Sequence, residues 1–124
     1  MKKIVSGVGV DAGIIMIADE DYYIGNNGKV VWRSAKLIEI GSGSYDVKWK
    51  IKDTWCGPIS GRGVVEITSG KMVISDPCYH FEDENWDKWL RKTDYGKICG
   101  RGVIIINEMG GDGTYSIELE ITER

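Results

Sequence analysis

Two short sequence blocks each occur twice along the chain, in the same order, and this duplication restricts the fold more than any other feature. Residues 13–23, GIIMIADEDYY, align without gaps with residues 70–80, GKMVISDPCYH, and keep a Gly, an Ile, an Asp and a Tyr in place. Residues 41–47, GSGSYDV, align in the same way with residues 111–117, GDGTYSI. Two collinear matches predict two copies of one β unit.

A length of 124 residues fits one domain, 1–124, which is long enough to bury a core but too short to divide into two independent ones. The two copies, 4–52 and 61–122, are expected to close on each other about a pseudo-twofold axis, because neither can bury its apolar face alone. Seventeen glycines, two prolines and many Val, Ile, Trp and Tyr residues indicate short strands and tight turns. The sequence predicts an all-β fold with one short helix, either a β-sandwich or a partly open barrel built from two related halves.

Apolar stretches bounded by glycine predict most of the strands. They cover residues 8–10, 14–17, 29–32, 36–40, 62–67, 71–75 and 103–109. Two further strands, 45–52 and 115–122, alternate apolar and polar residues, and their polar faces carry three lysines and two glutamates respectively. If these two strands pair, each lysine that faces a glutamate contributes about 0.2–1 kcal/mol to stability. The alternative is that both polar faces are simply solvated.

One helix is predicted from Asp83 to Lys92. Trp86, Trp89 and Leu90 follow one another at helical spacing, acidic residues stand in the first turn, basic residues stand in the last turn, and a glycine follows. The three apolar side chains are expected to pack against the sheet.

Charge and cysteine content exclude several classes of protein. A net charge of −3 argues against a protein that coats nucleic acid. No apolar run is long enough for a membrane span, and residues 1–4 lack the apolar core of a signal peptide, so a cytoplasmic protein is expected. The odd set Cys56, Cys78 and Cys99 contains no C-x-x-C pair, and we expect three free, buried thiols.

The duplicated aspartates, Asp19 and Asp76, end predicted strands. Asp76 followed by Pro77 suits a type I turn in which the carboxylate bonds the backbone two residues on. The functional alternative pairs Asp76 with His80 as a base and its orienting partner, or gathers them with nearby acids around a divalent cation. These further acids are Glu82, Asp83 and Glu84. The spacing matches no known ligand pattern and the cysteines are scattered, so neither a metal nor a cofactor is predicted.

Two arginines are framed by glycines, Arg62 in GRGVV and Arg101 in GRGVI. Flanking glycines allow close approach of a ligand to the backbone, and a guanidinium offers paired donors for phosphate. Together the two side chains are predicted to clamp an anionic ligand such as a diphosphate or a cyclic nucleotide. The alternative is an exposed arginine at the start of each strand.

Aromatic residues with a polar edge predominate, with five Trp and six Tyr against one Phe. Rings of this kind are enriched at binding surfaces and stack on bases. The aromatic residues that follow the duplicated aspartates are candidates for one ligand pocket: Tyr22, Tyr23, Tyr79, Trp86 and Trp89. The alternative is that most of them pack in the core.

The segments Val10–Ile17, Ser75–Tyr79 and Gly111–Tyr115 together resemble a loose group of small uncharacterised proteins from bacteria and their phages. Members of this group share a D-P-C-Y turn and a terminal G-D-G-x-Y strand. The resemblance implies an all-β fold. It implies no activity and no catalytic residue.

Three functions follow as hypotheses. The first is a non-catalytic, homo-oligomeric protein that captures an anionic, nucleotide-like small molecule, as a phage sponge against host defence would do. One ground is negative, since G-x-S-x-G and P-loop motifs are absent and the glycines do not precede a helix as a dinucleotide fingerprint requires. The other is positive, since glycine-framed arginines and aromatic residues with a polar edge suit an anionic ligand that contains a ring. The second is an inhibitor or immunity factor that binds a basic protein through Asp83, Glu84 and Asp87. The third is a small hydrolase that uses Asp76 and His80.

Overall fold

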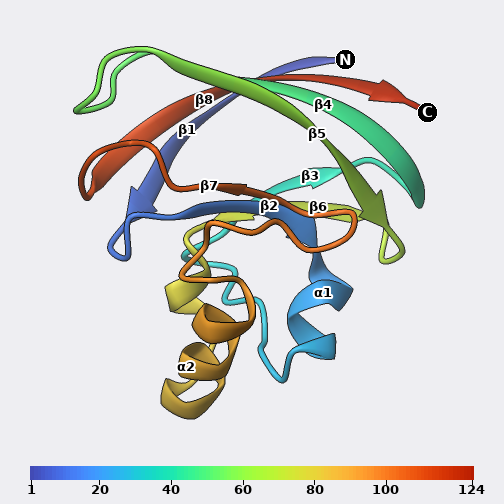
Figure 1. Ribbon diagram of the computed structural model, residues 1–124. Helices are drawn as coiled ribbons and strands as arrows, with labels where there is room; N and C mark the ends of the chain where they lie inside the picture. The colour runs from blue at the N-terminus through green and yellow to red at the C-terminus, as the bar shows by residue number, and fades with distance from the viewer.

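The computed structural model describes residues 1–124 and shows two antiparallel sheets packed face to face (Figure 1). The open sheet has the order β1-β8-β4-β5 and the covered sheet has the order β3-β6-β2-β7. Strands of the open sheet are β1 (Lys2–Val10), β8 (Gly113–Glu123), β4 (Gly43–Ile51) and β5 (Ile59–Ile67). Strands of the covered sheet are β3 (Lys36–Glu39), β6 (Lys71–Ser75), β2 (Ile15–Asp19) and β7 (Ile104–Ile106). The prediction of an all-β fold is confirmed, and its form is a sandwich, not a closed barrel.

Both sheets have a strand order that is symmetrical between the first and second halves of the chain. β4 and β8 form the centre of the open sheet, and β2 and β6 form the centre of the covered sheet. Exchanging β1 with β5, β2 with β6, β3 with β7 and β4 with β8 leaves every pair of neighbours unchanged. Each half therefore contributes one central and one edge strand to each sheet.

The two charged strands lie side by side in the open sheet, as the hypothesis of charge pairing requires. In the register of β4 and β8, Lys48 faces Glu120 and Lys50 faces Glu118. Lys52 also forms an ion pair with Glu118 at 3.1 Å. The alternating residues on the other face of these strands are buried in the core between the sheets.

Strands β6, β2 and β7 of the covered sheet are buried on both faces, which explains why they read as largely continuous apolar runs. The edge strand β3 is exposed except at Ile38. In β2, Ile15 and Ile17 point into the core between the sheets. Met16 and Ala18 point to the opposite face, where they join a second core beneath the helices.

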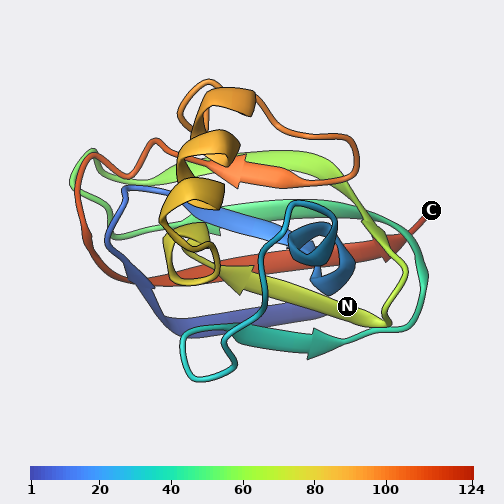
Figure 2. The same cartoon turned by 90° about the horizontal axis from the view of Figure 1, so that it is seen from below.

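Helices α1 (Glu20–Gly25) and α2 (Asp83–Lys92) lie over the outer face of the covered sheet (Figure 2). The predicted helix 83–92 is confirmed with the predicted bounds. Trp89 is fully buried in the second core, and Trp86 and Leu90 pack against that core. The Trp89 ring stacks on Trp86 at 5.5 Å and on Phe81 at 5.8 Å between ring centroids.

Several local predictions were wrong. Residues 29–32 form no strand, because the N–H groups of Lys29 and Val31 bond the carbonyl and the ring of His80 and join no strand ladder. β7 is shorter than the predicted 103–109. Helix α1 was not predicted. The turn predicted after Asp76 takes the form of a 3₁₀ turn, η1 (Pro77–Tyr79), at the position after β6 that matches α1 after β2.

The three cysteines are free, as expected, but the prediction that they are buried was wrong. Cys56 and Cys99 are exposed and Cys78 is half-buried. Cys56 and Cys99 lie in loops and not in the buried strands. None of the helices combines the length and the apolar character needed to cross a membrane.

Candidate functional site

Asp76 binds the turn that leads into the opposite central strand. Its Oδ2 accepts N–H bonds from Asp11 and Ala12, each at 2.8 Å, and its Oδ1 accepts one from the N–H of Cys78 at 2.9 Å. The residue is fully buried. The bond to Cys78, two residues on, confirms the predicted turn, whereas the bonds across to residues 11 and 12 were not predicted.

Asp19 binds the turn that precedes β6 in the same way. Its carboxylate accepts bonds from the backbone N–H of Thr68 at 2.8 Å and of Ser69 at 3.2 Å, and from both hydroxyls. Burial would raise the pKa of Asp19, but the hydrogen bonds from Ser69 and Thr68 outweigh it and lower that pKa. Because β2 and β6 are antiparallel neighbours, each aspartate lies beside the turn that precedes the other strand. The duplicated aspartates therefore hold turns together.

His80 is held in one neutral form. Its Nδ1 accepts the N–H of Val31 at 2.9 Å and so carries no proton, which leaves Nε2 to donate to the Ser75 hydroxyl at 2.7 Å. Ser75 in turn donates to the carbonyl of Ser34 at 3.0 Å. No hydrogen bond joins His80 to Asp76. The arrangement predicted for a base and its orienting partner is not formed.

The buried His80 should make the protein less stable in mild acid. Burial lowers the pKa of His80 to about 4. Between pH 6.5 and pH 4 the unfolded chain therefore binds a proton that the native protein does not bind, and stability falls as the pH falls. We expect a loss of about 2 kcal/mol in the free energy of unfolding from pH 7 to pH 5, measured by urea denaturation. The His80→Asn variant should lose much less over this interval, and an equal loss in both proteins would contradict the assignment.

Cys78 does not supply a nucleophile. Burial and the nearby carboxylate of Asp76 both raise the pKa of the Cys78 thiol. The thiolate, which is the nucleophilic form, is therefore not populated at neutral pH.

The two duplicated tyrosines have separate surroundings. The Tyr79 hydroxyl donates to the carboxylate of Asp11, and this bond and burial raise the pKa of Tyr79. The Tyr22 hydroxyl instead accepts the indole N–H of Trp89 at 3.1 Å and lies in a surface cleft between the helices and the loop before β7. Trp86 packs against the second core. The predicted aromatic pocket is therefore divided, and only Tyr22 faces a cleft that also contains a predicted arginine.

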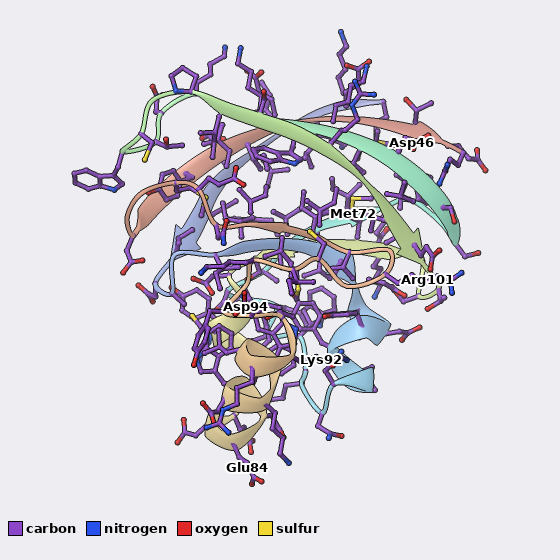
Figure 3. The ribbon with its side chains drawn as sticks, in the orientation of Figure 1. Asp46, Met72, Glu84, Lys92, Asp94 and Arg101 are labelled. Carbon is purple, nitrogen blue, oxygen red and sulfur yellow. The ribbon has the colours of Figure 1, made fainter.

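This cleft, which we call the cationic cleft, has a volume of about 360 Å³. It is lined by Tyr22, Gly25, Asn26, Lys92, Thr93, Ile98, Cys99, Gly100 and Arg101. Lys92 is the last residue of α2, and Arg101 lies in the loop between α2 and β7 (Figure 3). Lys92 Nζ donates to the side-chain oxygen of Asn26 at 2.9 Å, which ties the end of α2 to the end of α1.

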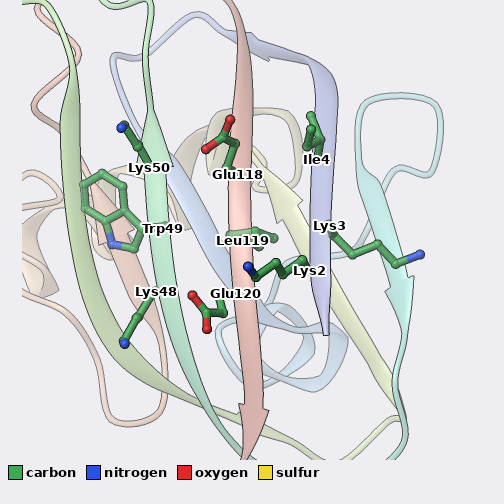
Figure 4. A pocket seen from close by; sticks show the side chains of 9 residues that line it. All are labelled: Lys2, Lys3, Ile4, Lys48, Trp49, Lys50, Glu118, Leu119 and Glu120. Atoms are coloured by element: carbon green, nitrogen blue, oxygen red, sulfur yellow. The ribbon is translucent and has the colours of Figure 1, made fainter.

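No carboxylate lines the cationic cleft. A cleft of about 470 Å³ on the open sheet contains Lys2, Lys48 and Lys50 but places Glu118 and Glu120 among them (Figure 4). A third cleft, at the end of the sandwich, contains two aspartates. The cationic cleft is therefore the one whose charge suits an anion.

Arg62 lies elsewhere. It is exposed on β5, where it faces Lys48 in the register of the open sheet. The two glycine-framed arginines therefore line no common cleft, because residues 59–67 form a full strand whereas Arg101 stands in a loop on the helix side. From the sequence, Lys92 was predicted only to end a helix, and Asn26 and Cys99 were not predicted to line a ligand site. The reason is that the cleft depends on α1, whose sequence has no clear helical pattern.

Two of the three acidic residues predicted to bind a partner through α2 are paired along the helix itself. Glu84 pairs with Lys88 at 3.2 Å and Asp87 pairs with Arg91 at 3.0 Å, all with exposed side chains. This pairing gives no support to a surface for a basic partner.

No protein-family model matches the chain, and no significant similarity to a curated protein or to a solved structure is found. The functional conclusion therefore depends on the geometry of the site.

Proposed function

We propose that this protein is a non-catalytic binding protein that captures an anionic, nucleotide-like small molecule in the cationic cleft. The observation that carries the proposal is the presence of Lys92 and Arg101 in a cleft without a carboxylate. A guanidinium donates two parallel hydrogen bonds to phosphate, and an ammonium adds a compact positive charge.

Tyr22 supports the second part of the proposal, a ligand with a ring. Its hydroxyl accepts a bond from Trp89, so its own proton is free to donate to a ligand oxygen. Burial raises the pKa of Tyr22, which keeps that proton in place at neutral pH. The ring lines the cleft, and a volume of about 360 Å³ lies within the range of small-molecule sites.

Capture without turnover would act by lowering the free concentration of the ligand. A cytoplasmic homo-oligomer that removes a nucleotide signal, as a phage sponge against host defence does, needs only such a site. Two observations support binding over hydrolysis. No hydrogen bond joins His80 to Asp76, and the thiol of Cys78 stays protonated.

Removing either cation should weaken binding by about 10- to 100-fold, because a hydrogen bond to a charged group contributes about 1.5–3 kcal/mol. Isothermal titration calorimetry with linear and cyclic mono- and dinucleotides would measure the loss in Lys92→Ala and Arg101→Ala. The matched control is Arg62→Ala, which removes an exposed, glycine-framed arginine outside the cleft and should bind as the wild type does.

Two results would contradict the proposal. One is that no nucleotide of the panel binds to the wild-type protein. The other is that Arg62→Ala weakens binding as strongly as Arg101→Ala does. That result would show that both glycine-framed arginines bind the ligand and that the cationic cleft alone does not.

A further inference from the structure

Trp55 is the most exposed large apolar residue of the protein, with 75% of its surface accessible. It lies in the loop between β4 and β5, at the end of the sandwich. Single apolar residues on a surface are common and need no explanation. Trp55 differs because the structure fixes its position.

Three features hold Trp55 against the segment that precedes β8. Its backbone N–H donates to the carbonyl of Met109 at 3.0 Å, and its indole Nε1–H donates to the carbonyl of Asp112 at 3.1 Å. Gly111 leaves room for the indole, since a Cβ at that position would lie 2.7 Å from the ring atom Cδ1. The exposed ring is thus ordered before any ligand arrives, which lowers the entropic cost of binding.

The ring borders a cleft of about 720 Å³, whose lining combines a second aromatic residue, Tyr115, with several polar residues. Asp53, Asp112 and Thr114 line it beside the tryptophan. Lys52, the one cation of the lining, is paired with Glu118 at 3.1 Å. Because Tyr115 is buried, Trp55 is the aromatic ring that the cleft exposes. It lies among acceptors of hydrogen bonds, and the one cation of the lining is already paired.

We propose that this cleft binds a neutral carbohydrate. The C–H groups of one face of a pyranose ring are apolar and carry a small positive charge, so they pack on the negative face of an indole. The hydroxyl groups at the rim of the same sugar donate to carboxylates, which Asp53 and Asp112 supply. A single aromatic plate suffices for a sugar ring, whereas a protein partner needs an apolar patch of several residues. The two carboxylates exclude the anions that suit the cationic cleft.

The test is affinity electrophoresis of the purified protein in gels that contain laminarin, galactomannan, xyloglucan or hydroxyethylcellulose, each a neutral soluble polysaccharide. At least one should retard the wild-type protein. Trp55→Ala should weaken that retardation at least tenfold, Trp55→Tyr should keep part of it because it keeps an aromatic plate, and Asp112→Asn should weaken it about threefold.

Trp32→Ala is the matched control, because Trp32 is 45% exposed and does not line the cleft. It should be retarded as the wild type is. An unchanged melting temperature of Trp55→Ala would show that the exposed ring is not needed for folding. The proposal is overturned if none of the four polysaccharides retards the protein, or if Trp55→Ala is retarded as strongly as the wild type.

Discussion

Replacing Asp76 with alanine should lower the free energy of unfolding by about 3–5 kcal/mol. The substitution leaves the N–H groups of Asp11, Ala12 and Cys78 without their acceptor. Each unsatisfied donor costs about 1–3 kcal/mol, and partial access of water to the turn reduces the sum. The effect is large because one carboxylate joins the end of β6 to the turn that precedes β2.

Urea denaturation at pH 7 would measure this loss. Asp46→Ala is the control, because Asp46 lies on β4 with a largely exposed side chain and a long ion-pair distance of 3.7 Å to Arg124. It should change the free energy of unfolding by less than about 1 kcal/mol. A loss below about 1 kcal/mol in Asp76→Ala would show that the turn is held by other contacts.

Replacing Trp89 with alanine should cost about 3–5 kcal/mol of stability and also weaken ligand binding at the cationic cleft. Its ring is 1% exposed and packs against the rings of both Phe81 and Trp86 in the second core. Its indole N–H also bonds the hydroxyl of Tyr22. The substitution therefore opens a cavity beneath α2. It also removes the hydrogen bond that positions Tyr22 in the cationic cleft.

Trp89→Phe separates these two effects, because phenylalanine fills much of the cavity but provides no N–H for Tyr22. We expect a smaller loss of stability in urea denaturation, together with weaker binding of whichever nucleotide the wild-type protein binds in calorimetry. If Trp89→Phe binds that nucleotide as the wild type does, the bond to Tyr22 has no part in the site.

Local patterns predicted much of the fold. The helix 83–92 follows from Trp86, Trp89 and Leu90 at helical spacing with charged residues suited to each end, all of which are properties of one segment. Charge alternation in 45–52 and 115–122 indicated a strand pair, which Lys48 facing Glu120 confirms. In contrast, residues 29–32 have the composition of a strand but give their N–H groups to His80.

The candidate site was predicted less well. Tyr22 and Arg101 were predicted for a ligand and line the cationic cleft, but Lys92 and Asn26 join them only through the meeting of two helix ends. No local pattern pointed to Trp55, since its fixed position depends on hydrogen bonds to the carbonyls of Met109 and Asp112, far away in the chain.

The sequence by itself determined most of the strands, the main helix and the use of equivalent residues in both halves, because hydrophobic period and turn chemistry act within a few residues. Only the tertiary structure decided that Asp19 and Asp76 each bind the other half's turn, that Arg62 and Arg101 line no common cleft, and that Trp55 is held in place on the surface. These facts depend on which strands become neighbours. That choice minimises the free energy of the whole packed chain, and no single segment records it.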